Sequence, residues 1–533
     1  MNAAFDSPDL RERQRAEGRR SPGPDSAEAA YVFRHALLRD AAYQLQLPGD
    51  RARLHALAFA LIEDLCGGRP PEPPPLDAPD PPPFAPHATD PFARELAQHA
   101  REAIRSPAVP ASALHLYLQR AAVVAERTIQ PGAEECWLEL ADILEGTLQG
   151  AAFLHAGQVA RARGRPGSAE IHFSKGLAVS RAVGDRRQEA LVLGSLGIVH
   201  QDTGRIEEAE RTYGEALSIH RELDDRRAQG LPLANLGNLY GETGRLEQAE
   251  RTHEQALAIH REFGNRRLAG ISLGNLANCC LATGRLEQAE RLYEQALEID
   301  RAVGNRSYEG LELGNLALLF NMTGRVEQAE RTYEEALAIH REVGNRRWEG
   351  TALGSLAVVF KETGRVEAAE RTYERALAIH REVGNRRGEG VALGQLANIY
   401  QESGRVEEAE TAYERALAIH REVGNPRFEG IELANLASLY YESGRIEQAG
   451  SFFLRALEIM RATGDLRSEG LTQGSFAVFL ARTGRAAEAR ARWAEGVETL
   501  NRRGNAKDLR RMTEDMRAAC AKAGTAPLDE GGG

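Results

Sequence analysis

The most constraining feature of this sequence is a repeat of constant length that runs through its central and C-terminal parts. A Gly-Arg pair recurs every 40 residues from Gly164 to Gly484, and a second marker, Gly-Asn or a close variant, recurs in the same register from Gly184 to Gly504. Nine copies span residues 150–509 without an insertion or deletion. A period in this range indicates a solenoid, in which each unit buries its apolar face against its neighbours.

The two markers indicate helix boundaries. Gly264 suits the left-handed residue that ends a helix, and Asn265 suits the cap that starts the next one. Gly284 is expected to end the second helix in the same way. The pattern therefore predicts a helical hairpin in each repeat, with helices near 266–282 and 286–303 in one copy.

Small and apolar residues recur at helical spacing in each hairpin. Leu233, Leu236, Gly237 and Tyr240 form one apolar stripe on the first helix. We expect Gly237 and Ala249 to be small because two helix backbones approach closely, and a bulky side chain at Ala249 is expected to cost roughly 1–3 kcal/mol. Helices of this length are marginal alone, so the hairpins must stack in an all-α fold.

The segments outside the repeats differ in composition. One stretch holds 11 of the 22 prolines, which excludes helix or sheet interior and predicts an extended spacer. The predicted organisation is disorder over 1–30, a helical segment over 31–66, a Pro-rich linker over 67–92, degenerate helical repeats over 93–149, a capping helix over 510–523 and a disordered tail over 524–533.

Charge, cysteine content and motifs narrow the classes of function. The net charge is −11 and the pI is near 5.8, so neither nucleic acid nor an anionic membrane is expected as the main partner. The five cysteines show no C-x-x-C spacing, and no secretory or transmembrane stretch stands out, which predicts a cytoplasmic setting. Phosphate-loop, G-x-S-x-G, H-E-x-x-H and kinase motifs do not occur, so we expect no enzyme and no cofactor.

The repeat residues resemble the tetratricopeptide family. The resemblance rests on Leu236-Gly237, Tyr240, Ala249, the ring position at His253, and Ala256. The 40-residue period is similar to the longer repeats of kinesin light chains and Pins-type polarity adaptors, and GNRRGEGVALGQLANIY at 384–400 is especially similar to the latter. The resemblance implies a right-handed superhelical solenoid that binds peptides along a concave surface made mainly by the first helix of each hairpin.

A second resemblance concerns residues 31–150. Phe33-Arg34-His35, Arg39-Asp40-Ala41-Ala42-Tyr43, Arg53-Leu54-His55 and Glu95-Leu96-Ala97-Gln98-His99 look like the segment that follows the nucleotide-binding module in bacterial signal-transduction ATPases. In those proteins the ATPase precedes helical repeats that sense a ligand or partner. The ATPase is missing from this sequence, so the resemblance implies a signalling context without ATP hydrolysis.

Polar residues recur on the face of the first helix opposite its apolar stripe. Carboxamides offer both donors and an acceptor to an extended peptide, and arginines on the same stripe suit acidic side chains. The alternative is that the amides only bond neighbouring helices and order the superhelix. The predicted peptide-binding residues are Asn235, Asn238, Asn275, Asn278, Asn315, Gln395, Asn398, Asn435, Arg227, Arg267, Arg347 and Arg387.

Histidines also recur at the repeat interval, at His220, His260, His340, His380 and His420. Equivalent positions on packed helices lie about 8–10 Å or more apart, whereas metal–nitrogen bonds are about 2 Å long, so neighbours cannot share an ion. No metal site is expected. A histidine near a helix C-terminus is instead favourably placed against the helix dipole, which predicts a structural role.

Together these features predict a scaffold or adaptor that holds an extended peptide of a partner protein, with acidic residues, in a concave groove. The alternative is a sensing arm of a bacterial signal-transduction ATPase or kinase system that lacks its own ATPase. A closed pocket of ligand size would favour the sensor, and an open continuous groove would favour the adaptor.

Overall fold

The structure is a computed structural model that describes residues 48–76, 83–103, 109–110, 112–128, 132–502, 506–524 and 526–529. The predicted disorder over 1–30 and the first part of the helical segment over 31–66 lie outside these residues. The regular elements of the described ranges are all helices, which confirms the all-α prediction. None of these helices is long and apolar enough to cross a membrane. The chain divides into two compact units, Met1–Leu239 and Tyr240–Gly533.

The first unit holds the degenerate helices and the first repeats. Its elements are α3 (Pro48–Leu65), the short 3-10 helix η1 (Asp90–Phe92), α4 (Ala93–Glu102), α5 (Ala113–Arg127), α6 (Ala133–Ile143), α7 (Gly146–Ala162), α8 (Pro166–Val183), α9 (Arg186–Asp202), α10 (Ile206–Glu222) and most of α11 (Gly230–Glu242).

The Pro-rich segment between α3 and α4 is hydrogen-bonded to a side chain of α5. The buried guanidinium of Arg120 donates hydrogen bonds to the carboxylate of Asp90 at 2.8 Å and to the carbonyls of Pro71 at 2.8 Å and Ala85 at 2.9 Å. A buried cation requires such partners, and the carbonyls of an extended segment supply them. The described parts of this segment, up to residue 76 and from residue 83, therefore belong to the packed structure of this unit, which the composition did not indicate.

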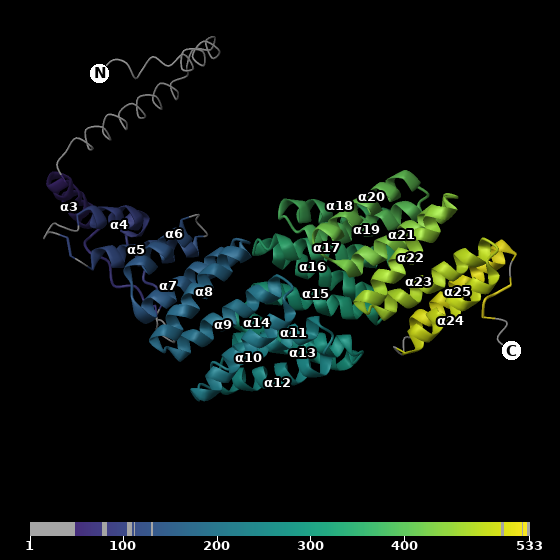
Figure 1. Cartoon of the computed structure of the whole chain (residues 1–533), viewed down its shortest axis with the longest axis horizontal. Helices are drawn as coiled ribbons and strands as arrows, with labels where there is room; N and C mark the ends of the chain where they lie inside the picture. The colour runs from purple at the N-terminus through teal and green to yellow at the C-terminus, as the bar shows by residue number, and fades with distance from the viewer. Residues whose placement is uncertain are drawn as a thin grey trace, which may run out of the picture. The chain divides into compact units, whose positions relative to one another are not determined.

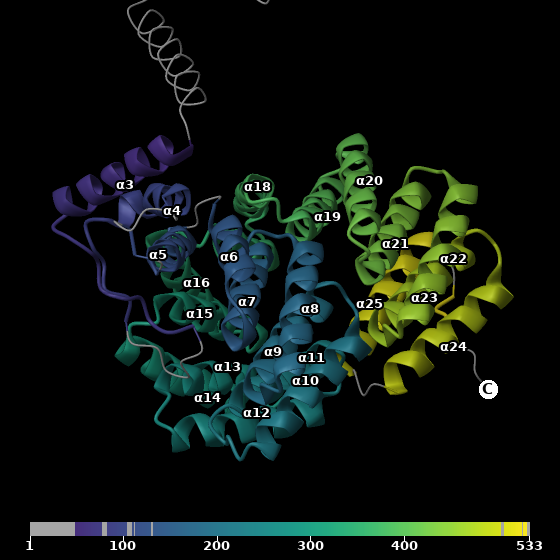
Figure 2. The same cartoon turned by 60° about the vertical axis from the view of Figure 1, so that its left-hand side comes forward.

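The second unit is a continuous series of hairpins (Figures 1 and 2). We call the first helix of each hairpin helix A and the second helix B; each A helix packs against its B helix and also contacts the next A helix. The helices are α12 (Leu246–Glu262), α13 (Arg266–Ala282), α14 (Leu286–Val303), α15 (Arg306–Met322), α16 (Val326–Glu342), α17 (Arg346–Glu362), α18 (Val366–Glu382), α19 (Arg386–Glu402), α20 (Val406–Glu422), α21 (Pro426–Glu442), α22 (Ile446–Thr463), α23 (Leu466–Arg482), α24 (Ala486–Arg502) and α25 (Ala506–Ala523).

The glycine and asparagine markers end and start helices as predicted. Gly264 has a φ of 65° and Gly284 a φ of 76°, in the left-handed region that favours glycine. The side chain of Asn265 accepts a hydrogen bond from the backbone N–H of Leu268 at 3.1 Å, which caps α13. The predicted boundaries at 266–282 and 286–303 coincide with α13 and α14.

The hairpin interior is built on small buried residues, as the helical spacing predicts. Ala249 and Ala256 are fully buried. At Gly197, which is equivalent to Gly237, an added Cβ would overlap the ring of Tyr213. At Gly197 the backbone of helix A therefore lies close to a ring from helix B, which leaves no room for a side chain.

Candidate functional site

The predicted peptide-binding residues are divided between the two units. Arg227, Asn235 and Asn238 belong to the first unit, and the remaining nine belong to the second. The arginines are exposed, and the amides range from half-buried to exposed. We therefore describe the site on the A helices of the second unit alone.

Two of the amides are hydrogen-bonded to the tyrosine of their own hairpin. The hydroxyl of Tyr293 donates to the side-chain oxygen of Asn278 at 2.6 Å, and the hydroxyl of Tyr413 donates to that of Asn398 at 2.6 Å. These bonds join helix A to helix B. For Asn278 and Asn398 the alternative role, in ordering the hairpin, has direct geometric support.

Two further amides bond to buried carboxyl groups that the sequence-based reasoning missed. Asn315 bonds Glu312, and the side-chain nitrogen of Asn435 donates to Glu432 at 3.4 Å. Each glutamate is only 3% exposed. Burial raises the pKa of both carboxyls to about 8, so they are mainly protonated near neutral pH. The available signal was a glutamate at a repeat position that otherwise holds small residues such as Ala352.

These glutamates define two kinds of contact between consecutive A helices, which we call joints. In the joints α13–α15 and α19–α21 the carboxyl lies against a glycine: a Cβ added at Gly274 or Gly394 would overlap Glu312 or Glu432. In the joint α17–α19 the corresponding residues are Gly354 and Ala392, and a Cβ added at Gly354 would meet no atom within 4 Å. The first kind of joint is filled and the second is open.

The open joint between α17 and α19 contains a cavity of about 470 Å³, which we call the α17–α19 cavity. Its walls are mainly apolar, and they include predicted residues from two consecutive repeats. Its lining includes Arg347, Ser355, Val358, Arg387, Val391 and Gln395, together with Trp348 and His380.

Arginines at the start of helix A differ in whether a carboxylate neutralises them. In several joints the arginine pairs with an aspartate at the start of the next helix A, across one repeat. These pairs are Arg187–Asp225 at 3.2 Å, Arg427–Asp465 at 2.8 Å and Arg467–Asp508 at 2.5 Å.

At the α17–α19 cavity this neutralisation does not occur. The positions equivalent to Asp225 and Asp465 are Asn385, opposite Arg347, and Asn425, opposite Arg387. Neither arginine forms an ion pair with another residue of the described ranges. Both guanidinium groups lie at the wall of an apolar cavity with their hydrogen-bond donors available to a ligand.

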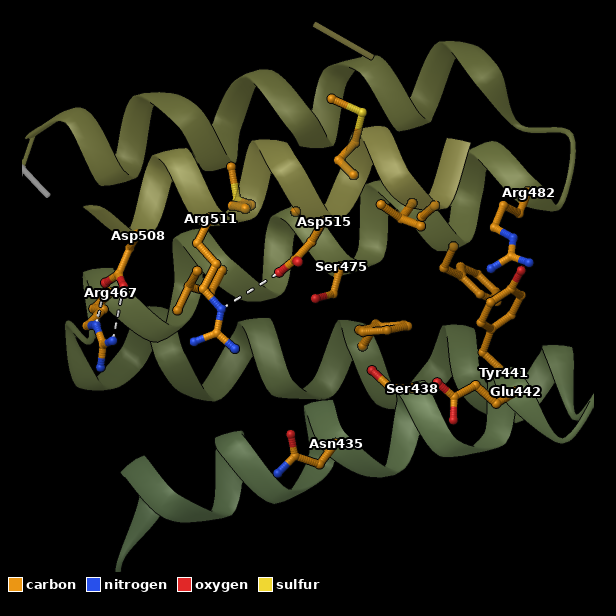
Figure 3. Close-up of a pocket in the computed structure, with 18 residues that line it drawn as sticks. Asn435, Ser438, Tyr441, Glu442, Arg467, Ser475, Arg482, Asp508, Arg511 and Asp515 are labelled. Atoms are coloured by element: carbon orange, nitrogen blue, oxygen red, sulfur yellow. Dashed lines mark hydrogen bonds and ion pairs between the residues drawn. The ribbon is translucent and has the colours of Figure 1, made fainter. Parts of the chain in front are cut away.

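A second cavity, of about 550 Å³, lies among α21, α23 and α25. Figure 3 shows Asn435 and Ser438 from α21 and Ser475 from α23 facing Arg511 and Asp515 of α25. Its charges are largely paired within the protein: Arg511 lies 3.9 Å from Asp515, and Arg467 is bound to Asp508. This cavity is polar and self-neutralised, in contrast to the α17–α19 cavity.

The repeated histidines are buried and neutral, which corrects the predicted interaction with the helix dipole. His340, His380 and His420 are at most 5% exposed. Burial lowers the pKa of each, to about 4 for His420. An uncharged imidazole gains little from a helix C-terminus. The rings instead pack against a glycine of helix A, as His340 does against Gly310.

Comparison with known families identifies the repeats. Residues 148–222 and 229–302 match the tetratricopeptide repeat family, and residues 315–524 match the MalT-like TPR region. The chain is a tetratricopeptide-repeat protein. The predicted family is thereby confirmed, and such repeats are typical of protein-binding scaffolds and of sensor domains.

Several solved structures are similar to parts of the chain at low identity. The apo form of the quorum sensor NprR from B. thuringiensis is 15% identical with a TM-score of 0.49, over 61% of this chain and 92% of that one. A signal transduction ATPase with a tetratricopeptide repeat sensor from Pyrococcus horikoshii is 16% identical with a TM-score of 0.44, over 64% and 54%. BtubC from P. vanneervenii is 24% identical with a TM-score of 0.36, over 40% and 91%. No curated protein matches the chain.

Proposed function

We propose that this tetratricopeptide-repeat protein is a non-catalytic scaffold that holds an extended, acidic peptide of a partner protein along the A helices of its second unit. The observation that carries the proposal is the pair Arg347 and Arg387, which line an apolar cavity and have no carboxylate partner in the described part of the chain. Guanidinium groups bind carboxylates through charge-assisted hydrogen bonds, which are stronger than neutral ones.

The cavity supplies the other contacts that a peptide needs. Gln395 and Ser355 offer hydrogen bonds to a peptide backbone, and Val358 and Val391 offer an apolar surface. Because the two arginines occupy equivalent positions in consecutive repeats, a ligand that lies across the joint meets both. An extended peptide can present acidic groups to both arginines while its backbone lies over the side-chain amide of Gln395.

A sensing arm is the second candidate, and the volume of the α17–α19 cavity favours it. About 470 Å³ lies within the range of roughly 300–1,000 Å³ that is common for small-molecule sites. However, Trp348 and Arg347 in its wall are exposed, so the cavity opens to the protein surface, as expected of a peptide-binding site. Binding of a small molecule without any peptide affinity would favour the sensor.

Charge reversal tests the proposed scaffold. Fluorescent peptides rich in aspartate and glutamate, and neutral peptides of the same length, are titrated with the full chain and with the double variant Arg347→Glu, Arg387→Glu. We expect the acidic peptides to bind the double variant at least about tenfold more weakly, because two charge-assisted hydrogen-bond sites are replaced by repulsive charges.

The matched control is Arg371→Glu with Arg375→Glu, two exposed positions on the helix B α18. It changes the net charge equally on a different helix face, so it separates a local contact from long-range attraction. Equal loss of binding in both double variants, or no loss in either, would contradict the proposed binding face.

A further inference from the structure

At one position in the first turn of helix A, most repeats of the second unit carry a large side chain, whereas α19 carries glycine. The residues at this position in the second unit are Leu268, Tyr308, Trp348, Gly388, Phe428 and Ser468. Gly388 follows the cap Asn385, whose side chain accepts a hydrogen bond from its backbone N–H at 3.1 Å. Its φ is outside the left-handed region, so the backbone does not require glycine here.

The next repeat shows what a ring does at this position. Phe428 stacks on His420, with ring centroids 5.2 Å apart and an interplanar angle of 27°. Offset stacking of this kind stabilises aromatic pairs beyond the area that they bury. Phe428 thereby covers the histidine of the preceding helix B from the side of the A helices.

At Gly388 the equivalent histidine has no such cover and forms part of the wall of the α17–α19 cavity. His380 lies beside the glycine, and an added Cβ would come within 2.7 Å of its ring. Its Nδ1 lies 3.2 Å from the side-chain nitrogen of Asn385. Burial lowers the pKa of His380, so a neutral ring faces the cavity near pH 7.

The opposite wall is also depleted of large residues. Thr351 of α17 stands where other A helices carry Leu231, Leu311 or Ile431. A Cβ added at Gly354 would meet no atom within 4 Å, and Ala392 stands where the joints α13–α15 and α19–α21 place a buried glutamate. The cavity therefore results from several missing side chains, and not from the general geometry of stacked repeats.

We propose that the α17–α19 cavity receives one aromatic side chain of the bound peptide, which stacks on His380 in the way that Phe428 stacks on His420. This inference rests on the proposed peptide-binding function and adds the specificity of one subsite. Gly388 is the residue that determines it, because it leaves His380 without the ring that covers His420 in the next repeat. Flanking carboxylates of the same peptide reach Arg347 and Arg387.

The test measures the preference of the full chain for an aromatic residue. Three labelled acidic peptides differ only in a central Phe, Leu or Ala, and their affinities are measured by fluorescence anisotropy. We expect the Phe peptide to bind at least about tenfold more tightly than the Ala peptide, with the Leu peptide between them. The reason is that a ring removes much more apolar surface from water than a methyl group does, and can also stack on His380. The fluorescence of Trp348, in the cavity wall, should change on binding the Phe peptide.

Two variants fill the cavity from opposite walls. Gly388→Phe supplies the missing ring from α19, with His380 displaced to the position that His420 takes, and Thr351→Phe supplies one from α17. Either variant should bind the Phe and Ala peptides equally. Thr411→Phe, on the exposed face of the helix B α20, is the control and should keep the preference. If one cavity variant fails to fold, as judged by circular dichroism, the other variant still tests whether filling the cavity removes the preference for the Phe peptide.

The outcomes separate this inference from the proposed function. If the acidic peptides bind and charge reversal at Arg347 and Arg387 abolishes binding, yet Phe and Ala peptides bind equally, the subsite is refuted while the scaffold stands. If no peptide binds, both fail. If N-acetylphenylalanine amide alone binds as tightly as the Phe peptide, the cavity is a small-molecule site and the peptide-borne ring is refuted.

Discussion

The joints α17–α19 and α19–α21 share helix α19, and yet they are packed in opposite ways. In α19–α21 the carboxyl of Glu432 fills the space beside Gly394, and Asn435 bonds to that carboxyl. In α17–α19 the equivalent pair is Ala392 and Gly354, and the space stays open. Two repeats with nearly the same sequence therefore carry either a buried polar contact or a ligand-sized cavity.

This difference shows how a repeat protein acquires a local cavity without changing its fold. The residues that build each hairpin, such as the buried alanines and the capping glycines, hardly vary between copies. A change from glutamate to alanine at the joint position, together with the loss of a ring at Gly388, leaves the hairpins intact. Because each repeat contacts mainly its neighbours, such a change remains confined to one joint.

The largest effect is expected from removing the buried charge of the filled joint. The pKa of Glu432 is about 8 in the folded protein, against 4.5 for an ordinary glutamate, so the folded state binds the extra proton and its stability falls as pH rises from 4.5 through 8. Glu432→Gln should therefore increase the free energy of unfolding at pH 9 by roughly 3 kcal/mol and have little effect near pH 5.

Urea unfolding at both pH values measures this effect. The control Glu447→Gln changes an exposed glutamate of α22 and should leave the pH profile as it is. Conversely, Ala392→Glu should bring the same alkaline instability to the open joint. An unchanged pH profile in Glu432→Gln would show that this carboxyl is solvated, and the distinction between the two joints would fail.

A smaller effect is expected from the paired glycine substitutions. Gly394→Ala adds a methyl group that overlaps the buried carboxyl of Glu432, and it should destabilise the protein by about 1–3 kcal/mol. Gly354→Ala faces open space in the same position of the preceding repeat, and it should stabilise the protein by about 0.5–1 kcal/mol through helix propensity. Thermal or urea unfolding compares the two, and changes of the same sign would contradict the assignment of filled and open joints.

A third effect concerns the charge of the open joint. Asn385→Asp should let Arg347 form the ion pair that Arg427 forms with Asp465, and so weaken acidic peptides by about tenfold, or ~1.4 kcal/mol. Asn345→Asp is the matched control. It makes the same change one repeat earlier, where Ser307 stands in place of Arg347, so the new aspartate has no equivalent arginine to pair with. Anisotropy titrations of the two variants should differ, and equal affinities would mean that Arg347 does not contact the ligand.

The hairpins and the family could be predicted from the sequence because their signals are local. Gly264 and Asn265 act within one helix turn on either side, and the apolar spacing repeats nine times. The candidate site was predictable only in part. Arg347, Arg387 and Gln395 do lie together at one cavity, whereas Asn278, Asn398, Asn315 and Asn435 bond to side chains within the protein.

The sequence by itself determined the repeat length, the helix boundaries and the all-α solenoid, because each depends on residues a few positions apart. The tertiary structure decided which polar groups are available to a ligand. The deciding contacts join residues in successive repeats, such as Gly394 with Glu432 and Arg427 with Asp465, and the environment of each group depends on what the neighbouring helix places beside it. Burial sets the protonation of Glu432, and an aspartate of the next repeat neutralises Arg427, so neither can be assigned from one repeat alone.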